Sequence, residues 1–226
     1  MADQCLRLAA GSPSGPKPTW VYLVRHGETA VLGRILAGRM PGIHLTAHGR
    51  GQAAALAECF RPGDLDRILS SPLERALESG EFLARRLGLA IEVDEGFNEV
   101  DFGEWTGMAF SELCRRPEWQ AFNRSRSGFR IPGGESMGEV QARFCRRLET
   151  LHSQAPGGRI LVLSHADPIR AAIVRYRGLP LDAMLEHTVE PAETYQVLLQ
   201  GGSARVFKRG KTRTKSPAAW AAQKAG

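Results

Sequence analysis

An arginine and a histidine stand directly after a short apolar run near the start of the chain. Residues 21–24 (VYLV) are rich in β-branched and aromatic side chains, which predicts a buried strand that ends at Arg25 and His26. Ligands of open α/β sheets bind beyond the carboxyl ends of the strands, so these two side chains lie where chemistry usually occurs. A histidine there can act as a nucleophile, but it can equally be a hydrogen-bonding residue at a strand end.

A second strand is expected to deliver another cation to the same edge. Residues 66–70 fit a strand, and Ser71 with Glu74 predicts a capping box for a helix that has Pro72 at its first position. This arrangement places Arg75 in the first turn of the helix. The partial positive charge of the helix N-terminus then adds to the charge of the arginine.

A third strand repeats the pattern. Residues 159–164 (RILVLS) hold three consecutive aliphatic side chains, which is typical of a central strand, and His165 follows directly. Asp167 and Pro168 then predict the start of a helix in the same manner as after the second strand. Three strand ends therefore bring two arginines and two histidines to one edge of the sheet.

These side chains together suit a phosphoryl group. Each guanidinium group can bind two equatorial phosphate oxygens at once, and it stays charged at any working pH. Phosphoryl transfer mainly needs positioning and charge neutralisation, which the arginines can supply without Mg²⁺. An imidazole in line with the phosphorus can attack it and carry the group as phosphohistidine.

The order of the elements predicts an α/β fold, a three-layer α/β/α sandwich around a mostly parallel sheet. Further strands are expected at 90–94 and at 194–199, and the second of these pairs with 204–208. A helix is expected at about 46–60, with Thr46 as its N-cap. Another is expected at 136–152, where Ser136 and Glu139 form a capping box. The aromatic, helical pattern of about 104–134 predicts a small cap inserted over the carboxyl edge of the strands.

Composition limits the class of protein. The 226 residues fit a domain at 20–208 behind a flexible leader (1–19) and before a basic tail (209–226). Seven basic and no acidic residues follow position 204, so the net charge of +6 comes from the segment that begins at Arg205, which argues against specific nucleic-acid binding. No apolar run could span a membrane, and a cytoplasmic protein is expected. The four cysteines lack metal or disulfide spacing and are expected as free thiols, so we expect no metal and no cofactor.

Six short motifs occur in an order typical of one family. They are RHGET (25–29), LTxxGxxQA (45–53), SSPLxRA (70–76), NExxFG (98–103), PGGES (132–136) and SHxxxIR (164–170). The chain thereby resembles the histidine phosphatase superfamily, which has the phosphoglycerate-mutase-like fold, over roughly residues 20–200.

The resemblance implies a role for each residue at the sheet edge. His26 would be the catalytic nucleophile, Arg25, Arg75 and His165 would hold the phosphoryl group together with it, and Glu99 would be the proton donor. Neighbouring arginines should keep His26 neutral, and a bound phosphate dianion should favour protonated Glu99. Other carboxyl groups that could compete for the acid role are those of Glu28, Asp101 and Glu104.

Two positions depart from the family pattern. The position seven after Arg25 is usually an asparagine that contacts phosphate, and here it is Leu32. The missing hydrogen bond could come from Arg39 or from a backbone N–H. The residue after the second histidine is commonly glycine and is Ala166 here, which should narrow the pocket without removing activity.

The short cap favours hydrolysis of a phosphomonoester of a small metabolite. Glu99 and His165 lie 66 positions apart, less than in mutases that enclose a bisphosphate intermediate. The alternatives are a phosphoglycerate-mutase-type phosphotransferase and a non-catalytic phosphate-binding member. Sugar phosphates, nucleotide-like phosphates such as α-ribazole phosphate and phosphoglycerates all stay open as substrates, and so does the oligomeric state, including a homodimer. Candidate substrate contacts are Arg39, Phe102, Arg124, Arg126 and Arg130.

Overall fold

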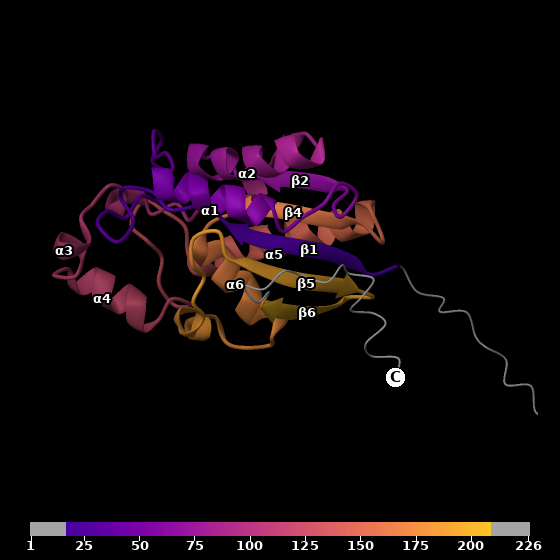
Figure 1. Cartoon of the computed structure of the whole chain (residues 1–226). Helices are drawn as coiled ribbons and strands as arrows, with labels where there is room; N and C mark the ends of the chain where they lie inside the picture. The colour runs from indigo at the N-terminus through magenta and orange to yellow at the C-terminus, as the bar shows by residue number, and fades with distance from the viewer. Residues whose placement is uncertain (1–16, 209–226) are drawn as a thin grey trace, which may run out of the picture.

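A computed structural model describes residues 17–208, which form an open sheet flanked by helices (Figure 1). The strands are β1 (Thr19–Arg25), β2 (Arg67–Ser70), β3 (Ile91–Val93), β4 (Arg159–Ser164), β5 (Thr194–Gln200) and β6 (Ser203–Lys208). Their order in the sheet is β3-β2-β4-β1-β5-β6. The first four strands in this order are mutually parallel, whereas β5 is antiparallel to both β1 and β6. The expected mostly parallel sheet is therefore confirmed, including the pairing of the last two strands.

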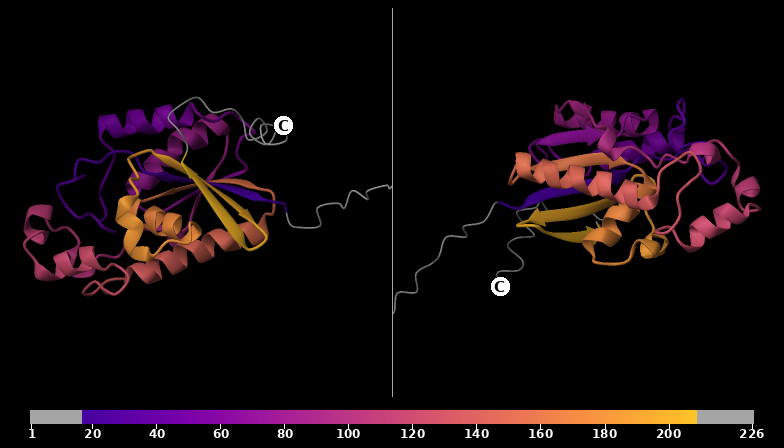
Figure 2. Two further views of the ribbon diagram at one scale, coloured as in Figure 1. Left: turned by 90° about the horizontal axis from the view of Figure 1, so that it is seen from below. Right: turned by 180° about the vertical axis from the view of Figure 1, so that it is seen from behind.

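Helices cover both faces of the sheet and complete the three-layer sandwich (Figure 2). One face carries α1 (Ala47–Ala57) and α2 (Glu74–Leu87), and the other carries α5 (Met137–Gln154) and α6 (Ala166–Tyr176). In β1, Tyr22 and Val24 pack in the core with α1 and α2, while Val21 and Leu23 pack in the core with α5 and α6. A strand covered on both faces is apolar at consecutive positions, which explains its unbroken apolar run.

A small cap lies beyond the carboxyl ends of the parallel strands (Figure 1). It contains η2 (Gly103–Trp105), α3 (Phe110–Leu113) and α4 (Pro117–Arg124), as the aromatic pattern predicts; η1 (Glu95–Phe97) precedes it and η3 (Leu181–Glu186) follows α6. Trp105 is its centre, with ring centroids 5.5 Å from Trp119, 5.5 Å from Phe122 and 5.8 Å from Phe129. These rings belong to a third hydrophobic cluster, in which the cap packs on residues of α5 and α6 such as Val140 and Val174.

Two of the expected helix caps are confirmed. Thr46 precedes α1 and accepts a hydrogen bond from the Gly49 N–H. Ser136 and Glu139 form the reciprocal capping box before α5. Both caps lie in connecting segments, where their side chains are free to serve the helix N-terminus.

Two other expected caps are wrong, and both follow strands that end at the site. The helix α2 begins at Glu74 with Leu73 as N-cap, so Ser71 and Pro72 precede it and no capping box forms. The Ser71 hydroxyl lies 2.8 Å from His165 Nε2 instead. The helix α6 begins at Ala166, so Asp167 lies inside its first turn and pairs with arginines rather than capping the helix.

The expectations about cysteines, the terminal segments and membrane spans can be compared with the structure only within residues 17–208. Cys114 and Cys145 are free thiols as expected, whereas Cys5 lies outside the described residues. Most of the leader and the basic tail at 209–226 also lie outside them. Between residues 17 and 208, no helix is both long and apolar enough to cross a membrane.

Two glycines allow the loop after β1 to pass close to α1. A Cβ atom on Gly27 would lie 2.5 Å from the Gly49 carbonyl oxygen, and one on Gly49 would lie 2.1 Å from the Glu28 carbonyl oxygen. Such contacts between a side chain and a backbone atom cannot be relieved by rotating a side chain. Because both residues lack a Cβ, the turn after His26 can pack directly against the backbone of the first turn of α1.

Replacement of Gly49 by alanine should destabilise the fold by about 1–3 kcal/mol, because the new methyl group overlaps backbone atoms. Gly51 is the matched control, since it belongs to the same helix and a Cβ there meets nothing within 4 Å. Gly51→Ala should stabilise the protein by roughly 0.5–1 kcal/mol through helix propensity. Urea unfolding measures both, and equal effects of the two variants would contradict the close-contact argument.

Candidate active site

Three strand ends bring the expected phosphate-binding residues together. His26 follows β1, His165 follows the adjacent strand β4, and Arg75 lies in the first turn of the helix after β2. The ring centroids of the two histidines are 5.2 Å apart, and Arg75 Nε lies 3.3 Å from His26 Nε2. Both imidazoles and the Arg75 side chain are buried. The convergence predicted from the sequence is thus present in the fold.

His26 has the orientation that a nucleophile requires. Its Nδ1 lies 2.7 Å from the Gly27 carbonyl oxygen, which can only accept, so Nδ1 carries the ring hydrogen. The lone pair is then on Nε2, which faces Arg75. Burial, followed by the charges of Arg75 and Arg25, holds the pKa of His26 well below its usual range. The imidazole is therefore neutral and able to attack at neutral pH.

The two arginines are anchored at one end and keep donors for a ligand at the other. Arg25 Nη1 donates to the Val189 carbonyl oxygen at 2.7 Å, and Arg75 Nη2 donates to the Gly38 carbonyl oxygen at 2.7 Å. Two buried donors, Arg25 Nε and Arg75 Nη1, have no hydrogen-bond partner in the structure, and the buried ring nitrogen His165 Nδ1 also lacks one. Buried donors without partners are costly, and an anion with several oxygens would satisfy them together.

Glu99 faces the same site from the loop after η1. Its Oε2 lies 3.9 Å from His165 Nδ1, and its Oε1 accepts a hydrogen bond from the Val100 N–H at 2.9 Å. Burial, with a contribution from the Asp167 carboxylate, raises the pKa of Glu99 to about 7, although Arg75 opposes the shift. This carboxyl group can therefore hold a proton near neutral pH and also release it.

The other carboxyl groups considered for the acid role have structural contacts elsewhere. Glu28 Oε1 accepts a hydrogen bond from the Thr46 hydroxyl, and Asp101 Oδ1 accepts one from the Gly103 N–H. Glu104 is exposed on η2. Their positions favour Glu99.

Of the five residues proposed to contact substrate, Arg39 contacts the Glu99 carbonyl group and Arg126 contacts Asp167, two residues after His165. Arg39 Nε donates to the Glu99 carbonyl oxygen at 2.9 Å, and buried Arg126 pairs through Nη1 with Asp167 Oδ2 at 2.9 Å.

The other three lie in different surroundings. Phe102 is only 3% exposed within the cap core. Arg124 is exposed at the end of α4, and exposed Arg130 pairs with Glu139.

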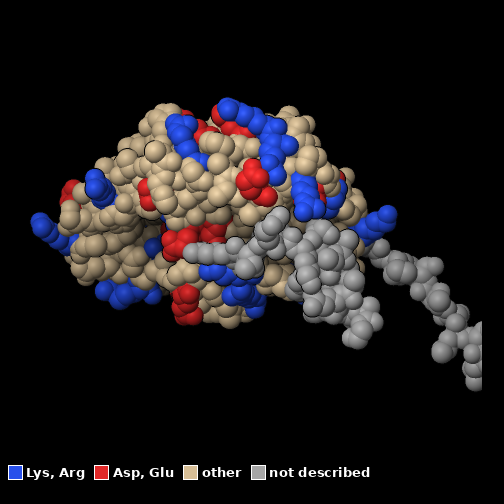
Figure 3. Space-filling view, in the orientation of Figure 1, with Lys and Arg blue, Asp and Glu red and all other residues tan. Residues whose placement is uncertain are grey.

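The face in the orientation of Figure 1 is hollowed between the cap and the body of the domain, with acidic and basic side chains at the edge of the hollow (Figure 3). Leu32, in place of the usual asparagine, is 42% exposed. The donors of Arg39 go to the Glu99 carbonyl and to Glu135, so its contacts are with protein groups. Over residues 17–208, no group of three or more metal-binding side chains is close enough to hold an ion.

Four further residues contact the site, although sequence patterns do not place them there. Ser71 and Asp167 fit helix caps in the sequence, but their positions next to a strand end also indicate the edge of the sheet. Arg143 and Glu135 contact the Glu99 loop across 44 and 34 positions. Contacts of that separation leave no trace in the spacing of a single sequence.

Comparisons with known proteins agree with this fold. The family model for the histidine phosphatase superfamily (branch 1) matches residues 21–212. This chain therefore belongs to the histidine phosphatase superfamily.

Curated relatives include a bifunctional protein and a probable mutase. The bifunctional protein Rv2228c of Mycobacterium tuberculosis is 34% identical over 192 residues, which is 80% of this chain and 51% of that protein. This chain thus spans about half the length of that relative. The probable phosphoglycerate mutase GpmB of Salmonella choleraesuis is 34% identical over 163 residues, which is 71% of this chain and 75% of that protein.

Solved structures share the fold. The mycobacterial glucosyl-3-phosphoglycerate phosphatase Rv2419c superposes with a TM-score of 0.76 at 24% identity, over 87% of this chain and 100% of that one. A mutant of the phosphoserine phosphatase of Entamoeba histolytica superposes with a TM-score of 0.75 at 27% identity, over 84% and 95% of the two chains.

The raised pKa of Glu99 should make stability depend on pH. The folded state binds this proton more tightly than the unfolded chain, so the contribution of Glu99 becomes unfavourable as pH rises from about 4.5 through about 7. At about 1.4 kcal/mol for each pKa unit, Glu99→Gln should stabilise the protein by up to roughly 3 kcal/mol at pH 8 relative to its effect at pH 4. Urea unfolding at both pH values measures the difference, and an effect independent of pH would contradict the assignment.

Proposed function

We propose that this protein is a phosphomonoesterase that hydrolyses a small phosphorylated metabolite through a phosphohistidine on His26, without a metal or cofactor. The observation that carries the proposal is the position of neutral His26 Nε2 beside buried donors that lack partners. Phosphatases among the superposed structures support the same class of reaction. The guanidinium groups of Arg25 and Arg75 supply the positive charge that a metal ion supplies in other phosphoryl-transfer enzymes.

In the first step, the substrate phosphate binds to Arg25, Arg75 and His165. The Nε2 lone pair of His26 forms the N–P bond while the P–O bond to the organic group breaks. The leaving oxygen takes the proton of Glu99, so an alcohol departs and Glu99 becomes a carboxylate. This proton transfer is needed most when the leaving group is an alkoxide, which is a strong base.

In the second step, water replaces the alcohol. The Glu99 carboxylate takes a proton from the water as its oxygen forms a bond to phosphorus, and the N–P bond breaks. Inorganic phosphate leaves, His26 is neutral again, and Glu99 holds its proton. A carboxyl with a pKa of about 7 serves both steps, because neither protonation state is strongly favoured at neutral pH.

The covalent intermediate gives a direct test. Rapid quench with a ³²P-labelled phosphomonoester should yield acid-labile label on His26, and His26→Ala should lose both the label and turnover. Peptide mapping under alkaline conditions locates the label. Equal hydrolysis by wild type and His26→Ala would exclude the proposed reaction.

The proton donor can be tested by its pH dependence. For an alkyl phosphate, kcat/KM should fall as pH rises above about 7, because Glu99 then loses the proton that it must donate. Glu99→Gln should reduce kcat/KM about 10²–10⁴-fold, and its pH profile should no longer show the alkaline limb, which is the fall above about pH 7. If the limb survives in the variant, another group donates the proton.

A phosphoglycerate-mutase-type transfer is the second candidate, because GpmB is a relative over most of its length. The short cap supports hydrolysis, since access for water to the phosphohistidine favours loss of the phosphoryl group. With 3-phosphoglycerate, release of inorganic phosphate should exceed formation of the 2-isomer. Phosphorus NMR follows both products, and faster isomerisation would establish the mutase instead.

A further inference from the structure

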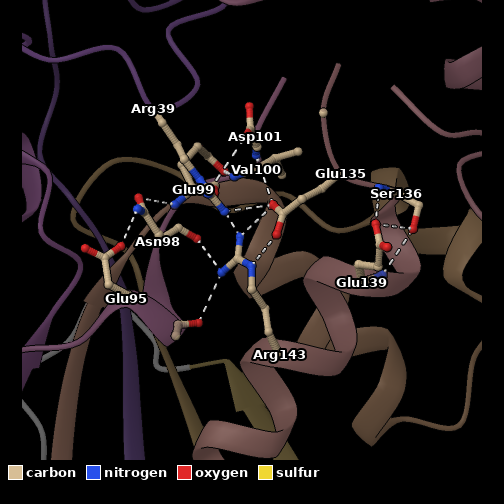
Figure 4. A network of polar contacts seen from close by, with 12 residues as sticks. Arg39, Glu95, Asn98, Glu99, Val100, Asp101, Glu135, Ser136, Glu139 and Arg143 are labelled. Atoms are coloured by element: carbon tan, nitrogen blue, oxygen red, sulfur yellow. Dashed lines mark hydrogen bonds and ion pairs between the residues drawn. The ribbon is translucent and has the colours of Figure 1, made fainter. Parts of the chain in front are cut away.

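A single arginine of α5 holds the backbone of the loop that carries Glu99 (Figure 4). Arg143 Nη1 donates to the carbonyl oxygens of Gly96 at 3.1 Å and Asn98 at 2.8 Å, and its Nη2 donates to the Glu99 carbonyl oxygen at 2.8 Å. Its remaining donors bind Glu135, with Nε 2.8 Å from Oε1 and Nη2 3.1 Å from Oε2. All five N–H groups of the guanidinium are therefore used, three on one loop and two on one carboxylate.

Glu135 extends this support to the other side of the loop. Its Oε2 accepts hydrogen bonds from the Asp101 N–H at 3.0 Å and from Arg39 Nη2 at 3.0 Å. Arg39 Nε in turn donates to the Glu99 carbonyl oxygen at 2.9 Å. The Glu99 carbonyl thus receives hydrogen bonds from two arginines that share one carboxylate (Figure 4).

The carboxyl group of Glu99 depends on this backbone for its position. The hydrogen bond that it accepts comes from the Val100 N–H, which belongs to the same loop. His165 Nδ1 is 3.9 Å away, which is too far for a hydrogen bond. A shift of the loop would therefore carry the carboxyl group with it.

We propose that Arg143 and Glu135 are positioning residues, which act through the loop backbone to hold the Glu99 carboxyl group in the site beside His165. The proposal rests on the proposed function, in which Glu99 protonates the leaving oxygen. A proton donor has to come within about 2.6–3.2 Å of its acceptor, so a small displacement of the loop removes its effect. Arg143 and Glu135 make no contact with Arg25, Arg75 or His165, so phosphate binding should depend much less on these two residues.

If Arg143 and Glu135 act only through Glu99, the effect of their substitution on kcat/KM should depend on the leaving group. An alkyl ester needs the Glu99 proton, whereas an aryl ester with a phenol of pKa near 7 departs without it. In Arg143→Gln, kcat/KM for an alkyl phosphate should fall about 10²-fold, while kcat/KM for the aryl phosphate should change by less than about tenfold. The ratio kcat/KM covers only the steps up to departure of the alcohol or phenol, so slow hydrolysis of the phosphohistidine does not mask the difference.

Arg147 provides a matched control. It lies one turn further along α5, its side chain is 27% exposed against 20% for Arg143, and it pairs with Asp94 rather than with the Glu99 loop carbonyls. Arg147→Gln removes the same charge from the same helix and should leave the ratio of the two ester rates unchanged. Glu135→Gln keeps the side-chain volume and should shift the ratio in the direction of Arg143→Gln, which provides a second variant if Arg143→Gln folds poorly.

The possible outcomes are distinct. A selective loss on the alkyl ester in the Arg143 and Glu135 variants, absent in Arg147→Gln, supports positioning. Equal losses on both esters overturn it. If His26→Ala hydrolyses either ester as fast as wild type, the proposed function fails, and a crystal structure of Arg143→Gln still judges the positioning: an unmoved Glu99 carboxyl group, still 3.9 Å from His165 Nδ1, overturns the proposal.

Discussion

The arrangement depends on two arginine side chains that are largely buried at the carboxyl edge of a parallel sheet. Burial of a charge is costly unless hydrogen bonds compensate for it, and each guanidinium here is tied to a backbone carbonyl, Arg25 to Val189 and Arg75 to Gly38. Their field, together with burial, also keeps both imidazoles neutral. The same charges thereby suit an anion and leave His26, the proposed nucleophile, uncharged.

A second set of charges acts on the protonation of Glu99, the proposed proton donor. Burial raises the pKa of Asp167, but the cations of Arg126 and Arg170 more than offset this, so Asp167 stays ionised beside the site. That negative charge, added to burial, favours the protonated form of Glu99. Because Arg126 belongs to the cap, the ion pair with Asp167 also links the cap to the first turn of α6.

The sequence allowed prediction of those parts of the site that depend on local patterns. Strand ends follow from apolar runs, so the meeting of His26, Arg75 and His165 could be predicted, as could the parallel sheet. Ser71 was assigned as a helix cap because serine before proline fits that role, and only the packing of β4 beside β2 brings it to His165. The contacts of Arg143 depend on how α5 lies on the sheet, which local patterns do not encode.

The hydrogen bond between Arg25 and the Val189 carbonyl can form only late in the synthesis of the chain. The two residues are 164 positions apart, and the Ala192 N–H donates to the carbonyl oxygens of Arg25 and His26 from the same late segment. A nascent chain therefore holds β1 to β4 before the segment that fixes Arg25 has been synthesised. The proposed phosphate site is completed only when this late segment reaches the end of β1.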